Sequence, residues 1–363
     1  MQDLYIGIMS GTSMDGIDTV IVNFASKTPE VLGHVYSQYP DAVKAQLLEL
    51  ITTKHADLEA LGALHTHLGE LYARDVLRIL STNNINADQI KAIGLHGQTI
   101  FHAPNHEHPF TWQLGNAHVV AATTNIPVIA DFRGLDVALQ GQGAPLAPLF
   151  HLALFGQLHE RVAVLNLGGI ANITLIEHQK ILQAFDTGPA NCLLDAWMLQ
   201  TQNKAYDKNG AFSRSGQILP ELLEQLLTEP YLQKAAPKST GRELFNVAWL
   251  NPKLHTDYET QDVAATLTEF TAITATAPLK LMPSNELILC GGGADNRFLV
   301  ERLQFHAQCL VSTSIDYGFK AEYIEPIAFA YLAKMALLEK PLHLQAITGS
   351  NKDHKSGIKY IPE

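Results

Sequence analysis

The feature that most constrains the fold of this chain is a pattern of strand, glycine turn and strand that occurs twice. Residues 4–24, LYIGIMSGTSMDGIDTVIVNF, and residues 161–177, RVAVLNLGGIANITLIE, each place two apolar, β-rich runs around a turn that contains glycine. Similar units within one chain indicate duplicated domains. The two hairpins therefore predict two related domains that face each other across a cleft.

The remaining segments alternate between helical and extended patterns. Residues 57–83 carry leucines at helical spacing with charges between them, and residues 90–100 and 126–132 are apolar runs with polar ends. A third apolar run, residues 180–186, closely follows the second hairpin. This alternation is typical of an α/β protein with mixed sheets flanked by helices, in which ligands bind beyond the strand ends.

A third glycine cluster lies within residues 286–303, ELILCGGGADNRFLVERL. An apolar strand there runs through Gly291, Gly292 and Gly293 into an amphipathic helix. Such a passage alone is more often a tight turn than a nucleotide site, and the chain has neither a Walker A nor a Gly-x-Gly-x-x-Gly sequence. The order of hairpin, hairpin and strand-glycine-helix, however, resembles the two phosphate loops and the adenosine loop of the actin, hexokinase and Hsp70 superfamily.

Composition excludes several classes of protein. A chain of 363 residues with 47% hydrophobic and 17% charged residues suits two well-buried domains. Its net charge of -11 argues against a nucleic-acid partner. No apolar run reaches the roughly 18 residues of a membrane helix, and no secretory leader is evident, so we expect a cytoplasmic protein without a membrane partner. Three widely spaced cysteines indicate neither disulfides nor zinc.

Longer motifs narrow the resemblance to the anhydro-N-acetylmuramic acid kinase family. They are GIMSGTSMDGID (7–18), GLHGQTIFH (94–102), ADFRGLDVA (130–138), GQGAPLAPLFH (141–151), LNLGGIANIT (165–174), FDTGPANCLLDAW (185–197) and STGRELFN (239–246). The chain departs from the family at Gly134, where a polar residue such as arginine is usual, and at Gln140, where glycine is usual. Both departures concern the sugar contacts expected after residues 126–132.

The resemblance implies a reaction. ATP, water and 1,6-anhydro-N-acetylmuramic acid would give N-acetylmuramic acid 6-phosphate and ADP, with hydrolytic opening of the anhydro ring and phosphorylation of O6. Water attacking C1 needs a general base, whereas phosphoryl transfer needs mainly alignment and charge compensation. The family also implies a homodimer that recycles cell-wall murein in a bacterial cytosol. The alternatives are another sugar or acyl kinase and a nucleotide-dependent binding protein of the same superfamily.

Asp186 is the candidate base, because FDTGPAN matches the catalytic motif of the family. It ends the run KILQAFD, and the following turn would direct its carboxylate towards a cleft. Alternatively, it caps the helical segment ANCLLDAWML. Ser13 does not indicate a serine hydrolase. Its loop is not Gly-x-Ser-x-Gly, and it joins two strands, whereas a nucleophile elbow joins a strand to a helix.

Four residues are candidates for the sugar. The guanidinium of Arg133 suits the lactyl carboxylate of the substrate, although Arg133 can instead form a salt bridge with Asp131 or Asp136. His96 and Gln98 suit sugar hydroxyls or the positioning of the base. The fourth candidate, Glu325, is the glutamate that faces the sugar in the family; its place at the start of a helix is also favourable without a ligand.

The three loops are expected to bind ATP. The residues concerned are Gly11, Thr12, Ser13, Met14, Asp15, Gly16, Ile17, Asp18, Asn166, Gly168, Gly169, Gly291, Gly292, Gly293 and Asn296. The first loop lacks lysine and arginine, so its amides and hydroxyls would bind the phosphates while Mg²⁺ supplies positive charge. Asp15 or Asp18 would hold the water molecules of that ion. The spacing of the histidines indicates no dedicated protein metal site.

These assignments predict two actin-like, ribonuclease H-like domains with the nucleotide in the interdomain cleft. The first would comprise residues 1–130 together with about 341–363, and the second residues 131–340. Closure of the cleft would shield the phosphoryl donor from water until the acceptor is bound.

Overall fold

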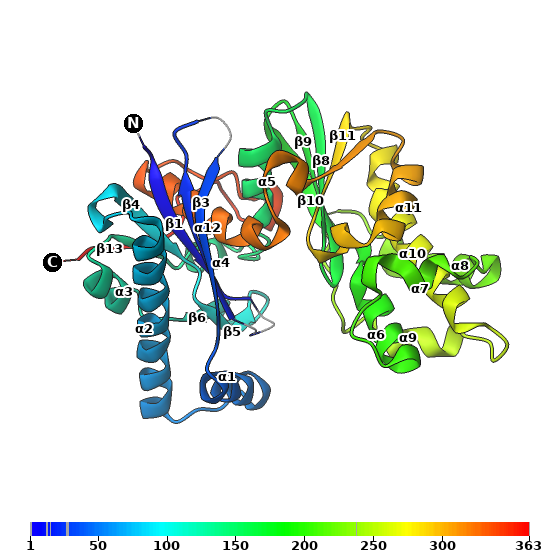
Figure 1. The fold of residues 1–363 in the computed structure, drawn as a ribbon, viewed down its shortest axis with the longest axis horizontal. Helices are drawn as coiled ribbons and strands as arrows, with labels where there is room; N and C mark the ends of the chain where they lie inside the picture. The colour runs from blue at the N-terminus through cyan, green and yellow to red at the C-terminus, as the bar shows by residue number, and fades with distance from the viewer. Residues whose placement is uncertain (1, 12–13, 15, 27–28, 237, 363) are drawn as a thin grey trace. The chain divides into compact units, whose positions relative to one another are not determined.

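The computed structural model of the chain describes residues 2–11, 14, 16–26, 29–236 and 238–362. It contains two compact units (Figure 1). Unit 1 comprises Met1–Phe150 and Glu322–Glu363, and unit 2 comprises His151–Ala321. Each unit is built on one mixed β-sheet with helices packed against it.

The sheet of unit 1 has the order β13-β7-β4-β1-β2-β3. Its strands are β1 (Leu4–Met9), β2 (Gly16–Asn23), β3 (Glu30–Gln38), β4 (Ile90–Leu95), β7 (Val128–Ala130) and β13 (Ile358–Tyr360). β1, β2 and β3 pair antiparallel, whereas β4 is parallel to both β1 and β7. The predicted hairpin at residues 4–24 is confirmed.

Two helical layers cover this sheet. The helices are α1 (Asp41–Thr53), α2 (Leu58–Asn83), α3 (Ala117–Thr124), α4 (Gly134–Ala138), α5 (Ala147–Phe155, which begins in unit 1), α12 (Ala321–Leu337) and α13 (Gln345–Thr348); β5 (Gln98–Ala103) and β6 (Phe110–Leu114) form a separate hairpin. Ile6 and Ile8 pack with leucines of α2 in the hydrophobic core, so Gly7 between them faces the opposite side. There a Cβ on Gly7 would overlap the carbonyl of Pro326 in α12.

The sheet of unit 2 has the order β10-β9-β8-β11-β12. Its strands are β8 (Arg161–Leu167), β9 (Ile170–Glu177), β10 (Lys180–Pro189), β11 (Glu286–Cys290) and β12 (Leu310–Thr313). β8, β9 and β10 pair antiparallel, and β11 is parallel to both β8 and β12. This repeats the order and directions of β3-β2-β1-β4-β7, so the predicted pair of α/β units with mixed sheets is confirmed.

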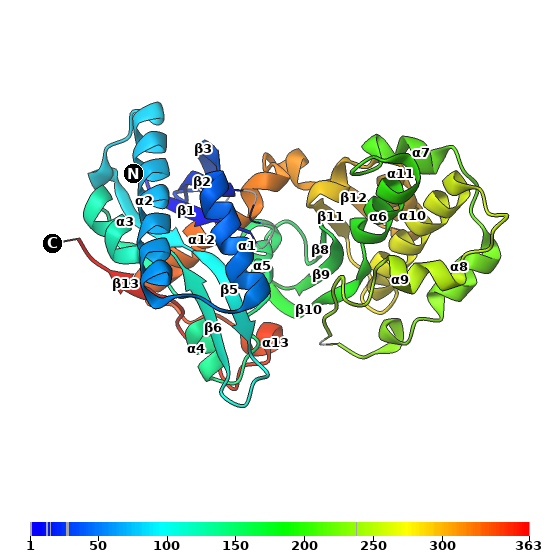
Figure 2. The same ribbon diagram turned by 90° about the horizontal axis from the view of Figure 1, so that it is seen from below.

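Helices of unit 2 pack around α10 (Thr260–Thr276), which is buried on most of its surface. The others are α6 (Asn191–Gln202), α7 (Ala211–Arg214), α8 (Pro220–Leu227), α9 (Val247–Leu250) and α11 (Arg297–Ala307). Figure 1 shows α10 between α11 and the group formed by α6 and α9, and Figure 2 shows the same helices from below. Within the described ranges, no helix has both the length and the apolar character required to cross a membrane.

The unit boundaries differ from the boundaries expected from the sequence. Residues 131–150 and 322–340 belong to unit 1, whereas the sequence analysis placed them in the second domain. One reason is the close packing of α12 on the sheet at Gly7 and Gly94. The other is that the C-terminal segment binds the segment after β7, because the amide of Asn351 donates to the carbonyl of Leu139 at 2.9 Å.

Candidate active site

The loop after β1 is held from beneath by two buried side chains, Ser10 and Gln98. Ser10 Oγ donates to the carbonyl of Gly97 at 3.0 Å. Gln98 Nε2 donates to the carbonyl of Gly11 at 3.2 Å, and its Oε1 accepts from the Tyr39 hydroxyl at 3.2 Å. The structure therefore places Gln98, a predicted sugar ligand, beneath the loop with both ends of its amide engaged.

The predicted residues of this loop separate into different environments. Thr12, Ser13 and Asp15 lie outside the described residues. The side chains of Met14 and Ile17 belong to the hydrophobic core, so any ligand contact they make would be through the backbone. Gly16 has no room for a side chain, since a Cβ would lie 2.7 Å from the ring of Tyr36.

Asp18 presents a carboxylate at the start of β2. Its Oδ1 accepts from His34 Nε2 of β3 at 2.8 Å, and 29% of the Asp18 side chain is exposed. The pKa of Glu325 is raised because the surrounding protein displaces solvent; nearby Arg133 opposes this rise and Asp18 adds to it. Asp18 and Arg133 thus both act on the charge of Glu325. The sequence pattern did not indicate that His34 contacts Asp18.

Arg133 forms a polar cluster with His96 at the ends of β7 and β4. Its Nε and Nη2 lie 3.2 and 3.0 Å from His96 Nε2, and its Nη1 donates to the carbonyl of Gly143 at 2.6 Å. Burial and the adjacent guanidinium lower the pKa of His96 to about 3, so the neutral ring accepts the proton of Arg133. Burial lowers the pKa of Arg133 to about 10, and Glu325 and Asp136 oppose this shift.

The structure does not show the salt bridge that was the alternative interpretation of Arg133. The contacts of its guanidinium are with His96 and Gly143, and no ion pair joins it to Asp131 or Asp136, all of which lie in the described part of the chain. These contacts engage three of the five N–H donors of an arginine. One donor therefore remains on each terminal nitrogen, and terminal nitrogens are the atoms through which arginine can bind a carboxylate.

The sequence predicted that Asp186 ends its strand. This prediction is wrong, because β10 continues to Pro189 and Asp186 lies inside it. The pairing with β9 is irregular between Asp186 and Gly188, which marks a β-bulge. The bulge takes the place of the predicted turn. Asp186 Oδ2 accepts from the amide of Thr240 at 3.0 Å.

This geometry argues against the capping interpretation of Asp186. α6 begins at Asn191 after Ala190, and no side chain caps it. Burial raises the pKa of Asp186; the hydrogen bond from Thr240 opposes the rise, and the negative charge of Glu243 adds to it. The carboxylate is therefore positioned by one backbone amide, and its desolvation makes it a stronger base than an exposed aspartate.

The turn between β8 and β9 is closed by the start of α6. The amide of Asn191 donates to the carbonyl of Gly168 at 3.0 Å, and that of Cys192 to the carbonyl of Gly169 at 3.0 Å. A Cβ on Gly169 would lie 3.3 Å from Nε of Arg242. An exposed guanidinium consequently lies beside the second glycine loop, and the motif STGRELFN alone did not predict this position.

The third glycine cluster forms a tight turn against the second loop. Gly291 has φ +79, and a Cβ there would lie 2.6 Å from Oδ1 of Asn166. A Cβ on Gly293 would lie 2.6 Å from Cβ of Leu167, whereas Gly292 faces open space. Asn296 caps α11 by accepting from the amide of Leu299 at 3.0 Å, so this predicted ligand also has a structural role.

A cavity of about 740 Å³ opens beside this turn within unit 2. Its lining includes Gly292 and Asn296, which the sequence predicted, and Asp195, Tyr206, Lys208 and Arg297, which it did not. Burial raises the pKa of Asp195 to about 6 against the opposing effect of Arg242. The mixture of an aromatic ring, amides and charged groups suits a polar ligand with a flat portion.

Comparison with known proteins gives concordant matches along the whole chain. A family model for anhydro-N-acetylmuramic acid kinase matches residues 3–362. The anhydro-N-acetylmuramic acid kinase of Aliivibrio fischeri is 45% identical over 364 residues, covering 99% of both chains. That of Pasteurella multocida is 44% identical, covering 99% of this chain and 97% of the relative. Among solved structures, a glucokinase of the ROK family from Streptomyces griseus, in complex with glucose and AMPPNP, is 13% identical with a TM-score of 0.42, covering 92% of this chain and 99% of its own.

Proposed function

We propose a function from the premise that this chain belongs to the anhydro-N-acetylmuramic acid kinase family. The protein is an ATP-dependent kinase that opens the anhydro ring of 1,6-anhydro-N-acetylmuramic acid with water and phosphorylates O6. The products are N-acetylmuramic acid 6-phosphate and ADP. The observation that carries this conclusion is the family match over residues 3–362.

Asp186 is the general base in this proposal. Its Oδ2 is held by the amide of Thr240, so Oδ1 is available to accept a proton from water. The water oxygen bonds to C1 as the bond between C1 and O6 breaks. O6 then bonds to the γ-phosphorus of ATP, and ADP leaves. Burial raises the pKa of Asp186, which favours the transfer of a proton from water to its carboxylate.

Arg133 binds the carboxylate of the lactyl group through the two remaining donors on its terminal nitrogens. His96 accepts from the same guanidinium and fixes its plane. Because the His96 ring is neutral, it leaves the positive charge of Arg133 available to the carboxylate of the sugar. Glu325 lies in the same electrostatic environment and is assigned to the sugar hydroxyls. Gln98 contributes by holding the carbonyl of Gly11.

ATP is assigned to the glycine loops and to the cavity beside Gly292. The cavity takes the nucleoside, since its lining combines Tyr206 with several polar side chains. Arg242 beside Gly169 is assigned to the phosphates, which supplies the positive charge that the first loop lacks. This cation would act in addition to the Mg²⁺ that the sequence predicts.

The donor set near the first loop also fits Mg²⁺. Asp18 is partly exposed, its second oxygen is not engaged by His34, and a further carboxylate, Glu325, shares its environment. Oxygen ligands of this kind suit a hard divalent cation that arrives with ATP. Bound there, the ion would neutralise phosphate charge. Asp18 would hold it directly or through water; the role predicted for Asp15 lies outside the described residues.

We further assign the protein to murein recycling in the cytoplasm, as a homodimer. Support comes from the family membership, because the named relatives are kinases of anhydro-N-acetylmuramic acid. A measurement of molecular mass by light scattering tests the dimer. Cell fractionation tests the location.

Isotope labelling tests the reaction. In ¹⁸O-water, the purified enzyme with ATP and 1,6-anhydro-N-acetylmuramic acid should place one ¹⁸O on C1 of the product and none in its phosphate, as read by mass spectrometry. Label in inorganic phosphate with no phosphorylated sugar would indicate simple ATP hydrolysis and would contradict the proposal. Replacing the substrate with other sugars separates this activity from that of a different sugar kinase.

A further inference from the structure

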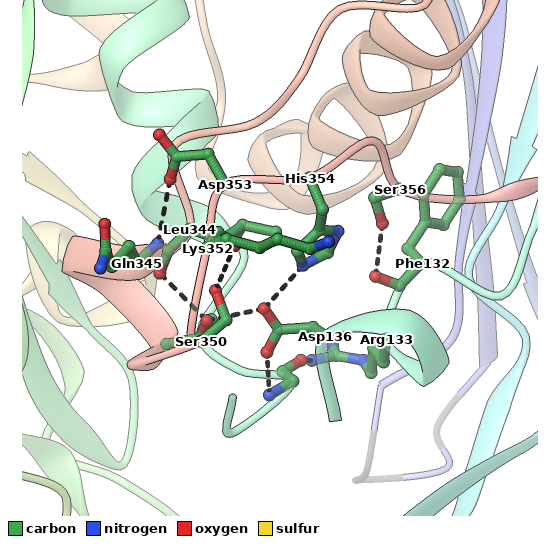
Figure 3. Close-up of polar contacts among 12 residues, drawn as sticks. Phe132, Arg133, Asp136, Leu344, Gln345, Ser350, Lys352, Asp353, His354 and Ser356 are labelled. Atoms are coloured by element: carbon green, nitrogen blue, oxygen red, sulfur yellow. Dashed lines mark hydrogen bonds and ion pairs between the residues drawn. The ribbon is translucent and has the colours of Figure 1, made fainter. Parts of the chain in front are cut away.

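The C-terminal segment of unit 1, residues 342–356, binds the loop that carries Arg133. The carbonyl of Phe132 accepts from Ser356 Oγ at 2.6 Å, and the amide of Gln142 donates to the carbonyl of Thr348 at 2.8 Å. Figure 3 shows Asp136 between Arg133 and the side chain of His354 from this segment. A carboxylate of the loop that carries Arg133 is thus paired with a histidine from the far end of the sequence.

Asp136 and His354 form a buried ion pair. His354 Nε2 lies 3.0 Å from Asp136 Oδ1, and the two side chains are 4% and 0% exposed. His354 Nδ1 lies 2.9 Å from the carbonyl of Lys355, which can only accept. Both neighbours of the ring are acceptors, so the ring donates to both when each of its nitrogens carries a proton. In that form the pair is an imidazolium and a carboxylate with no net charge.

The remaining contacts of Asp136 bring it close to Arg133 without joining them. Asp136 Oδ2 accepts from the amide of Gly143 at 2.6 Å, and the carbonyl of the same residue accepts from Arg133 Nη1 at 2.6 Å. Asp136 Oδ1 also accepts from Thr348 Oγ1 at 2.8 Å. A single residue, Gly143, therefore separates a buried carboxylate from a guanidinium that has two donors to spare.

Arg133 and Asp136 attract each other, since the negative charge of Asp136 opposes the lowering of the pKa of Arg133, and a guanidinium can hold a carboxylate by two parallel hydrogen bonds. His354 satisfies the charge of Asp136 from the other side. We propose that His354 is a specificity-determining positioning residue: by neutralising Asp136 it keeps the fork of Arg133 available for the carboxylate of the sugar. This inference rests on the proposed role of Arg133.

The test compares two sugars that differ in the acidic group. The KM for 1,6-anhydro-N-acetylmuramic acid and the Ki of 1,6-anhydro-N-acetylglucosamine, which lacks the lactyl carboxylate, are measured for each variant. His354→Gln should raise the KM of the acidic sugar roughly 10- to 100-fold, the factor for one lost contact between charged groups, and should leave the Ki of the neutral sugar unchanged. A further Asp136→Asn substitution should restore the KM to within about threefold, because a neutral amide does not capture Arg133.

The control is His343→Gln, in the same segment. His343 pairs with Asp353 at 2.7 Å on the surface, where the histidine side chain is 75% exposed, so both constants should match those of the parent. If His354→Gln does not fold, Asp136→Asn and the double variant carry the test: both should keep the parent ratio of KM to Ki. A changed ratio in either would overturn the proposal.

Two other results separate this inference from the function on which it rests. Equal weakening of both sugars by His354→Gln, or no repair by Asp136→Asn, shows a general structural role and overturns the inference alone, provided that Arg133→Gln selectively weakens the acidic sugar. If Arg133→Gln leaves the ratio unchanged, the proposed carboxylate site is itself wrong, and the inference falls with it.

Discussion

The β1–β2 turn of unit 1 and the β8–β9 turn of unit 2 occupy the same place in two sheets of the same order, yet their surroundings differ. The first is held from beneath by Ser10 and Gln98 and is followed by the carboxylate of Asp18. The second is held by the start of α6 and has Arg242 beside it. A shared topology thus provides two similar backbone turns, while elements distant in sequence give them different charges.

The largest effect should come from Asp186, the proposed base, on the strand that pairs with β9. Asp186→Asn should reduce turnover roughly 10²- to 10⁴-fold, since an amide cannot accept the proton of water, while ATP still binds. Steady-state kinetics and ATP titration measure the two quantities. Asp257→Asn, an exposed aspartate of the same unit, is the control. Unchanged turnover in Asp186→Asn would remove this residue from the chemistry.

The charge difference between the turns is tested at Arg242. Arg242→Gln should lower kcat/KM for ATP by about 10²-fold, because one cationic donor to the phosphates is lost. Arg214→Gln serves as the matched substitution, since Arg214 is occupied in a surface pair with Glu301 at 2.6 Å. If both variants keep the parent kcat/KM, Arg242 does not contribute to the binding of the ATP phosphates.

The packing inside each unit is tested by substitution of one glycine, Gly7 in unit 1 and Gly292 in unit 2. Gly7→Ala should destabilise unit 1 by about 1–3 kcal/mol, because its Cβ would overlap the backbone of α12. Gly292→Ala should change the free energy of unfolding by less than about 0.5 kcal/mol, because that position faces open space. Urea unfolding followed by circular dichroism measures both. Equal stability of the two variants would contradict the tight contact between β1 and α12.

The smallest effect concerns pH. The charge of Glu243 raises the pKa of Asp186, and the base must be unprotonated to act. Glu243→Gln should therefore lower the pKa of Asp186 and move the acidic limb of the kcat profile to lower pH, with little change at the plateau. A limb that stays in place or moves to higher pH would show that another group controls it.

Local patterns predicted much of the fold. The two hairpins and the strand before Gly291 were predicted correctly because alternating apolar residues and glycines act over a few neighbours. The family motifs identified Asp186 as a candidate for the same reason. Its position inside a strand was missed, since a β-bulge depends on the pairing with β9.

Contacts between distant segments account for what the sequence did not reveal. Arg242 lies beside Gly169 only because the segment 239–246 folds back on the second turn. The pairing of Asp136 with His354 spans most of the chain, so no local spacing signals it. Likewise, the close packing of α12 on the sheet of unit 1 requires glycine at positions 7 and 94, which lie on separate strands.

The return of α12 and β13 to the sheet of unit 1 has a consequence for biosynthesis. Residues 151–321 leave the ribosome as an uninterrupted block, so unit 2 can complete its sheet while translation continues. Unit 1 must wait for residues 322–363, and until then the strand face that contains Gly7 has no helix against it. The nascent N-terminal part of unit 1 therefore exposes apolar surface during the synthesis of unit 2, which is the stage at which its aggregation must be prevented.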